Sequence, residues 1–333
     1  MLEDEVEEYL KEEENTCAHE KNLTEATKFF FAGFQSSQIS RIFIFCFLLV
    51  IYWGTICGNL LIITLVSTSK ILHTPMYFFI SQLSIGDLLL PTDIVPNMLH
   101  ILLNNGATIT FIGCMTQLYF FCALETFECL LLTVMSYDRY VAICNPLRYS
   151  SIMTTAYCMR LAVISWLLGF SIAFIETITI SVMTFCGPNI INHFFCDLIP
   201  LVELACSDTY SIEMEGYILS FPVVVIPITI IIISYINIIA TILRFQSRIG
   251  RQKAFSTCSS HLIVVSIFYC TLLGVYIFPT GGQTLNIPKL TLCLFYTVFT
   301  PLFNPIIYSL RNKDIKDSLQ ETINKNVICS NIT

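Results

Sequence analysis

Long apolar segments, separated by short polar ones, run along the chain from about residue 41 to residue 310. Each is long enough for a helix that crosses a lipid bilayer, which needs about 20 apolar residues. Several contain proline or glycine, which membrane helices tolerate better than soluble ones. The pattern predicts an all-α membrane protein, a seven-transmembrane helix bundle, with spans near residues 41–67, 76–102, 111–134, 158–183, 214–243, 260–280 and 289–310.

The distribution of basic residues sets the orientation of this bundle. Twelve of the 17 lysines and arginines fall on one side of the predicted spans, the side that holds Arg139, Arg244 and Lys313. Cytoplasmic loops carry such an excess, so we expect the N-terminus outside and the C-terminus in the cytosol. Hydrophobic residues make up 55% of the chain and charged residues only 12%, against roughly 25% charged in soluble domains.

The net charge of −7 comes mainly from acids near the start of the chain, between Glu3 and Glu14. We expect residues 1–40 to form an extracellular, acidic, disordered tail; an acidic docking arm is the alternative. No cleaved signal peptide is evident, so the first span is expected to direct insertion. Asn22, in Asn22-Leu23-Thr24, is a predicted glycosylation site. Asn331-Ile332-Thr333 fits the same pattern but would lie in the cytosol.

Four of the fifteen cysteines are expected at the outer face: Cys114 opens the third span on the outside, and Cys186, Cys196 and Cys206 lie in the long loop before the fifth. Outer loops mature in an oxidising compartment, so an even set predicts two disulfides, although spacing leaves three pairings open. A zinc site is the alternative, with His193 as the one obvious imidazole nearby. Cys17, in the tail, is left over.

Several acids lie inside predicted spans, where an unpaired carboxylate is costly. Asp87 and Glu128 are expected at similar depth near mid-membrane, sharing a sodium ion or a proton; a neutral hydrogen-bonded cluster is the alternative. Glu125 lies one turn further out, broadly on the same helix face as Glu128. It would either select a cationic or hydrogen-bond-donating ligand or be a protonated wall residue.

Asp138, Arg139 and Tyr140 stand side by side where the third span ends, inside Met135-Ser136-Tyr137-Asp138-Arg139-Tyr140-Val141-Ala142-Ile143-Cys144. Other motifs accompany this one along the chain. They are Gly58-Asn59, His73-Thr74-Pro75-Met76-Tyr77-Phe78-Phe79, Leu83-Ser84-Ile85-Gly86-Asp87, Pro146-Leu147-Arg148-Tyr149, Ser234-Tyr235, Lys253-Ala254-Phe255-Ser256-Thr257-Cys258-Ser259-Ser260-His261 and Pro301-Leu302-Phe303-Asn304-Pro305-Ile306-Ile307-Tyr308-Ser309-Leu310-Arg311-Asn312.

Together these motifs resemble the vertebrate odorant (olfactory) receptors, a branch of the rhodopsin-like G-protein-coupled receptors, over about residues 24–320. The segment from Cys186 to Asp197 resembles the tetrapod-type class. The resemblance implies the disulfides Cys114–Cys196 and Cys186–Cys206, an ion or proton site at Asp87 and Glu128, and a short cytoplasmic amphipathic helix after the seventh span. It divides the chain into the tail 1–40, a seven-transmembrane receptor domain 41–311 and a cytoplasmic tail 312–333.

The sequence departs from the family pattern in three places. The acidic tail is longer than usual, Cys270 stands where glycine is common, and Asn145 replaces a frequent histidine.

The resemblance also implies a switch at the cytoplasmic side. Asp138 would hold the Arg139 guanidinium at rest by a charge-assisted hydrogen bond. Outward movement of the sixth span would free Arg139 for a G-protein helix, with Pro305 as a hinge. The expected switch residues are Asp138, Arg139, Tyr140, Tyr235, Asn304, Pro305 and Tyr308.

By the same resemblance, a ligand would bind in the outer half, between the third, fifth, sixth and seventh spans. Mostly apolar walls with a few hydroxyls suit small volatile organic molecules. The expected wall residues are Phe121, Cys122, Glu125, Thr126, Leu219, Ser220, Val223, Tyr269, Leu272, Leu273, Tyr276 and Thr297.

The implied function is that of an odorant receptor, not an enzyme, that activates the olfactory stimulatory heterotrimeric G protein and raises cyclic AMP. It would lie in the plasma membrane of the cilia of olfactory sensory neurons, with export chaperones as further partners. An alternative is a rhodopsin-like receptor for a non-odorant metabolite, expressed outside the nose. No span pairs a nucleophile with a base in a recognisable motif, as an intramembrane enzyme would require. Internal repeats typical of transporters are also missing.

Overall fold

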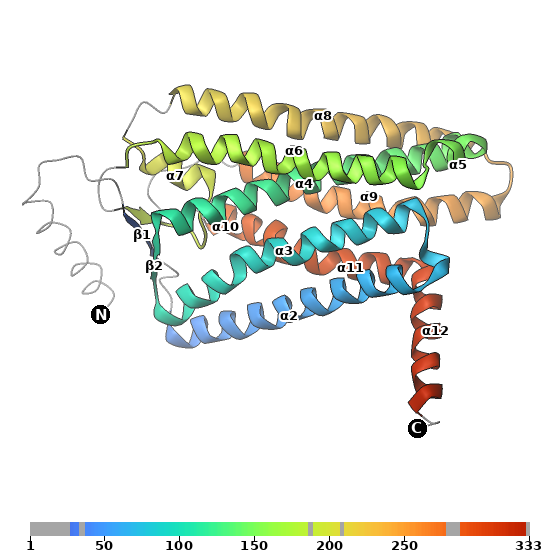
Figure 1. The fold of residues 1–333 in the computed structure, drawn as a ribbon, viewed down its shortest axis with the longest axis horizontal. Helices are drawn as coiled ribbons and strands as arrows, with labels where there is room; N and C mark the ends of the chain where they lie inside the picture. The colour runs from blue at the N-terminus through green and yellow to red at the C-terminus, as the bar shows by residue number, and fades with distance from the viewer. Residues whose placement is uncertain (1–26, 33–36, 186–188, 207–209, 278–286, 331–333) are drawn as a thin grey trace, which may run out of the picture.

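The computed structural model describes residues 27–32, 37–185, 189–206, 210–277 and 287–330. Within these ranges, seven helical segments are long and apolar enough to cross a membrane, as the sequence predicts. They lie lengthwise beside one another in one bundle (Figure 1). The segments are α2 (Gln38–Thr68), α3 (Pro75–Asn104), α4 (Phe111–Cys144), α6 (Thr155–Ser181), α8 (Tyr210–Leu243), α9 (Arg248–Ile277) and the run formed by α10 (Ile287–Leu294), η3 (Phe295–Phe299) and α11 (Thr300–Arg311).

Short elements connect or extend these helices. They are η1 (Lys70–Leu72), η2 (Pro146–Arg148), α5 (Tyr149–Ile152) and α7 (Leu198–Leu204). The helix α9 begins at Arg248, well before the apolar segment predicted near 260–280. Hydropathy detects only the part of a helix that is apolar enough to lie within the bilayer, and the polar first turns of α9 extend beyond that part.

Helix α4 is the central helix of the bundle. In its most apolar window, 61% of the residues are buried within the protein, against 22% for α6. The outward faces of α6 and α8 carry exposed apolar side chains such as Leu167, Ile218 and Ile236. Such a surface would be unstable in water but suits lipid contact, so burial by protein identifies the interior and apolar exposure identifies the lipid side.

The seventh membrane segment is interrupted where its sequence contains proline. Pro305 has no N–H, so the carbonyl of Pro301, four residues earlier, loses its helical partner. Asn59 of α2 replaces that partner, because its Nδ2 donates to the Pro301 oxygen at 3.0 Å. Just before this point, η3 is a π-helical stretch, and the Thr300 hydroxyl donates to the Phe295 carbonyl at 3.2 Å. The structure thus contains a locally weakened helix whose free backbone group is satisfied by a neighbouring helix.

A three-stranded sheet covers one end of the bundle (Figure 1). Its middle strand β1 (Lys28–Phe31) pairs antiparallel with β2 (Ala107–Thr110) and parallel with β3 (Ile190–Ile191). The prediction of a wholly disordered tail over residues 1–40 is therefore wrong for this segment. Alternate residues Phe29 and Phe31 are fully buried, and this burial fixes the strand on the bundle. Asn22, Cys17 and the acidic run lie outside the described residues.

A further helix, α12 (Lys313–Ser330), follows α11 and leaves the opposite end of the bundle at a steep angle (Figure 1). This confirms the predicted helix after the seventh span. Its start is fixed by side chains: Tyr77 donates to Asn312 at 2.8 Å and to Asp314 at 2.9 Å. Asn312 also accepts from the Asp314 N–H at 3.0 Å, as a helix N-cap does. Strand β1 and helix α12 therefore mark opposite ends, which we call the outer and cytoplasmic ends.

Candidate functional site

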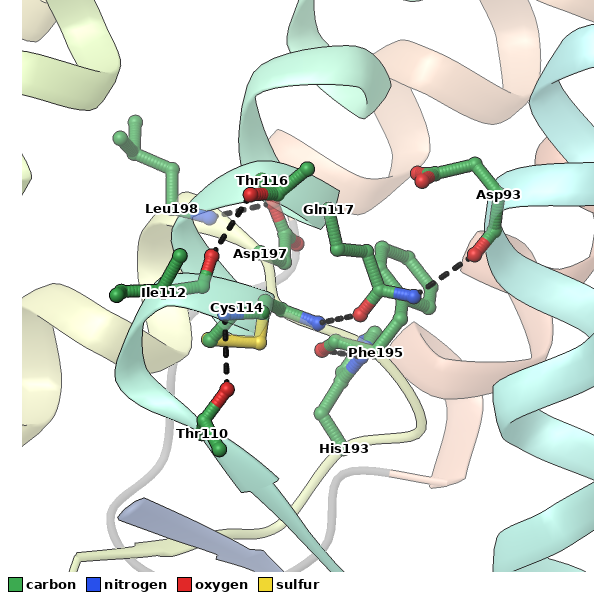
Figure 2. Close-up of a disulfide and its surroundings, with 12 residues drawn as sticks. Asp93, Thr110, Ile112, Cys114, Thr116, Gln117, His193, Phe195, Asp197 and Leu198 are labelled. Carbon is green, nitrogen blue, oxygen red and sulfur yellow. Dashed lines mark hydrogen bonds between the residues drawn. A yellow bond between two sulfur atoms is a disulfide. The ribbon is translucent and has the colours of Figure 1, made fainter. Parts of the chain in front are cut away.

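A disulfide joins the outer loop to the central helix (Figure 2). Cys114, in the first turn of α4, is bonded to Cys196, and both are fully buried. This confirms the pairing implied by the resemblance. Cys206 is also disulfide-bonded, while Cys186, its expected partner, lies outside the described residues.

Gln117 supports this disulfide from the next turn of α4 (Figure 2). Its Oε1 accepts from the Cys196 N–H at 3.0 Å, and its Nε2 donates to the Asp93 carbonyl at 2.9 Å. One amide therefore connects the loop, α4 and α3. No sequence motif singled out Gln117, although its position three residues after Cys114 places both on the same helix face.

The disulfide excludes the predicted zinc site made from the outer cysteines, because Cys114 and Cys196 have no free thiolate. The structure instead brings potential ligand atoms of His193, Asp197 and Cys293 within 4.8 Å of one another. His193 Nδ1 lies 3.2 Å from the Phe195 carbonyl, and Asp197 caps α7 by accepting from the Leu198 N–H at 2.7 Å.

The expected wall residues divide between two apolar clusters. Phe121 lies in the outer cluster, where its ring centroid is 5.0 Å from that of Phe195 and 6.3 Å from that of Tyr296. Val223 and Tyr269 lie in the cluster nearer the cytoplasm. The other members are Cys122, packed against the outer cluster; Leu272, in the cluster nearer the cytoplasm; Thr126 and Thr297, buried; Glu125, Leu219, Ser220 and Leu273, partly buried; and Tyr276, whose side chain is not described.

Phe195 and Tyr296 were not in the predicted set, yet both rings contact Phe121. Phe195 comes from the loop immediately before Cys196. The disulfide brings this loop onto α4, so only the folded chain shows the contact.

Among the buried acids, Glu125 differs from the others. Both of its carboxyl oxygens are buried and have no hydrogen-bond partner within the described part of the chain. Asp87 accepts from Asn304 Nδ2 at 3.0 and 3.1 Å, which joins α3 to α11. The Asn304 side chain also interacts with Glu128, whose Oε1 is buried without a partner among the described residues. Asp87 and Glu128 therefore share one amide donor, the Asn304 side chain. This agrees with the similar depth in the membrane that the sequence predicts for the two acids.

At the cytoplasmic end, Asp138 and Arg139 form a buried ion pair. Arg139 donates to Asp138 Oδ2 through its Nε at 2.9 Å and also through Nη2. The Tyr149 hydroxyl donates to Asp138 Oδ1 at 2.7 Å. Burial and the neighbouring Asp138 carboxylate raise the pKa of Tyr149, so its hydroxyl remains a donor at neutral pH.

Tyr235 of α8 is joined to α9. Its hydroxyl lies 2.7 Å from His261 Nδ1 and 3.3 Å from the Cys258 carbonyl, and its ring stacks on the histidine. His261 is fully buried. Its position in the sequence motif did not show that it would bind Tyr235 of α8. Tyr308 is buried close by in the same cluster, while Tyr140 is only partly buried. The structure thus places Asp138, Arg139, Tyr140, Tyr235 and Tyr308 towards the cytoplasmic end of the bundle. The other two predicted switch residues, Asn304 and Pro305, lie deeper, beside Asp87.

Comparison with known proteins identifies this arrangement. A family model described as Olfactory receptor matches residues 45–326. Olfactory receptor 10A7 of Homo sapiens is 44% identical over 308 residues, which cover 92% of this chain and 97% of that protein. Olfactory receptor 6B9 of Mus musculus is 43% identical over 303 residues, with 91% and 96% covered.

The fold is also similar to the crystal structure of squid rhodopsin. The TM-score is 0.67 at 18% sequence identity, and the similarity covers 89% of each chain. The enzyme and transporter alternatives are therefore set aside. The chain belongs to the olfactory receptor family, a group of seven-helix, rhodopsin-like signalling receptors.

Proposed function

We propose that this receptor binds small, mostly apolar organic odorants in its outer half and activates the stimulatory olfactory-type heterotrimeric G protein, which raises cyclic AMP. The observation that carries the proposal is the buried Asp138–Arg139 pair at the cytoplasmic end of α4. The same helix carries Phe121 and Glu125 at ligand depth. One rigid helix thus links the expected ligand residues to the expected G-protein contact.

In the resting state, the Asp138 carboxylate holds Arg139 within the bundle, and the Tyr149 hydroxyl holds that carboxylate. A buried ion pair is stable only while both partners and their hydrogen bonds remain in place. Tyr235 and His261 meanwhile join α8 to α9. Movement of α9 away from α4 would break this contact and expose Arg139 to a G-protein helix. A ligand that prefers the moved state shifts the population towards it by its difference in affinity between the two states.

The acids at mid-membrane would regulate the same equilibrium. The partnerless oxygen of Glu128, beside the Asp87–Asn304 pair, fits a hard cation that takes oxygen ligands. Asp87, Glu128 and Asn304 would hold a sodium ion, which supplies positive charge between the two carboxylates. Pro305 lies next to Asn304, so the weakened part of α11 adjoins this site.

The receptor is expected in the plasma membrane of olfactory sensory cilia, with export chaperones as partners. The test uses cells that lack their own stimulatory Gα subunit and into which the olfactory Gα subunit is introduced. A diverse odorant panel should raise cyclic AMP only with both receptor and Gα present. A ligand response of equal size without any stimulatory Gα would contradict the coupling.

A further inference from the structure

Carboxyl groups from three separate elements gather around Cys122 in the outer half of the bundle. The Cys122 thiol makes a hydrogen bond with Glu176 of α6 and interacts electrostatically with Asp197, before α7, and Glu125 of α4. Glu176 also interacts with Glu215 of α8. This part of the receptor is therefore surrounded by acids from α4, α6, α8 and the disulfide-bonded loop.

Most of these acids have a partner within the protein. Glu176 interacts with the Cys122 thiol, and Glu215 accepts from the Thr179 hydroxyl at 2.9 Å. Asp197 caps α7 and lies close to His193. Glu125 is the exception, because both of its oxygens are fully buried without a hydrogen-bond partner in the described ranges.

The orphaned carboxyl of Glu125 is unsatisfied in either protonation state. An ionised carboxylate needs donors or a cation, and a protonated one needs an acceptor for its hydrogen. Buried polar groups of native proteins are nearly always paired, so an exception calls for an explanation such as a role in binding a ligand. Glu125 lies one turn from Phe121, on the same face of α4.

Basic groups that could neutralise this cluster are scarce at the outer end. Among described side chains there, the lysines and arginines are Lys28, exposed on β1, and Arg41 of α2. Helix α2 packs against α3 and α11, away from the Cys122 cluster. Among the described residues, the imidazole of His193 lies near this cluster, and it is grouped with Asp197 rather than with Glu125. The electrostatic field around Glu125 therefore favours a cation.

We propose that Glu125 receives the ammonium group of a small organic amine, and that the ligand class of this receptor includes protonated amines with an apolar body. The inference rests on the proposed ligand site and names its chemistry. The apolar body would lie towards Phe121, whose ring contacts Phe195 and Tyr296. Aromatic faces also attract ammonium groups, which adds to the attraction of the carboxylates. A neutral alcohol of the same shape fits the apolar part but brings no positive charge to the Glu125 carboxyl.

The test compares amines and alcohols with identical carbon skeletons, such as 2-phenylethylamine with 2-phenylethanol and hexylamine with hexanol. Cells expressing the full chain are assayed for cyclic AMP, with surface level measured by an external tag. We expect amines to activate at lower concentration than their alcohols. Glu125→Gln should raise the amine EC50 by at least roughly 30-fold, the lower range for loss of a buried charge pair, and leave the alcohol EC50 almost unchanged. Glu203→Gln, at an exposed acid of α7, is the matched control and should change neither.

Equal potency of amines and alcohols, or equal loss of both in Glu125→Gln, would overturn the inference while the odorant-receptor proposal stands. Activation by other panel odorants but by no amine would also overturn the inference and leave the odorant-receptor proposal standing. Binding is also measured without signalling, as thermal stabilisation of the purified receptor by 2-phenylethylamine. Stabilisation that Glu125→Gln abolishes supports the inference even if cyclic AMP is not the output. No stabilisation of the wild-type receptor at millimolar amine contradicts it.

Discussion

Tyr149 and Arg139 bind opposite oxygens of one carboxylate, that of Asp138. The tyrosine comes from α5, outside the membrane-spanning helices, and the arginine from the end of α4. Because both donors must be in place for the buried carboxylate to be fully satisfied, the short cytoplasmic helix contributes directly to the resting state.

Replacing Tyr149 with phenylalanine should therefore raise ligand-independent signalling. The change removes one hydrogen bond to a charged group, worth about 1.5–3 kcal/mol, and leaves the ring in place, so basal cyclic AMP should rise roughly tenfold or more. Tyr157→Phe, on the more exposed start of α6, is the control and should leave the basal level unchanged. Basal activity equal to wild type at equal surface level would show that Tyr149 does not stabilise the resting state.

Gln117 should be nearly as important for export as the disulfide beside it. Gln117→Leu leaves the Cys196 N–H without its acceptor, at a cost of about 1–3 kcal/mol for the buried group, and removes the extra bond to the Asp93 carbonyl of α3. Surface level, measured by flow cytometry of a tagged receptor, should fall markedly, and Cys196→Ser should abolish it.

Thr116→Val provides the matched control for this experiment. Thr116 is an exposed neighbour whose hydroxyl bonds only within its own helix, to the Ile112 carbonyl at 2.8 Å. Normal export of Gln117→Leu would show that the glutamine bridge is dispensable.

The Asp87–Asn304 pair predicts sensitivity to sodium. Replacing sodium by N-methylglucamine should raise the basal signal of the wild-type receptor, because a cation between Asp87 and Glu128 favours the arrangement seen here. Asp87→Asn removes one of the two charges and should make the basal signal independent of sodium. A variant that responds to sodium as the wild type does would exclude Asp87 from the ion site.

Pro305 should affect efficacy rather than affinity. Pro305→Ala supplies an N–H for the Pro301 carbonyl, which competes with Asn59 and stiffens α11; a proline in a helix interior costs about 3 kcal/mol. The maximal response to an agonist should fall while the surface level is kept. Ile306→Ala, at an exposed neighbour, serves as control. An unchanged maximum would argue against a hinge at this point.

The sequence predicted the features that depend on hydropathy and on family motifs. Seven apolar segments were sufficient to predict the spans. The orientation, drawn from the excess of basic residues on one side, stays a prediction. The Cys114–Cys196 pairing followed from the resemblance, since spacing alone left three pairings open. The sequence did not predict the strand Lys28–Phe31, because four residues beside a long acidic tail are too few to show a reliable alternation of apolar and polar positions.

Contacts between helices could not be predicted in the same way. The bonds of Gln117, Tyr149 and His261 depend on which faces of distant segments meet. Hydropathy reports whether a side chain prefers lipid or water, but not which polar partner it finds across a helix boundary. That the oxygens of Glu125 have no partner among the described residues depends on where its neighbours lie, which the sequence does not give.

The central claim is that Arg139 carries the signal from a ligand-binding bundle to a G protein. It is tested most directly by comparing agonist-stimulated cyclic AMP in wild type and Arg139→Ala at matched surface level, with the best odorant from the panel as agonist. We expect a saturable cyclic AMP response in wild type and no response above background in the variant. A normal dose–response curve in Arg139→Ala would contradict it.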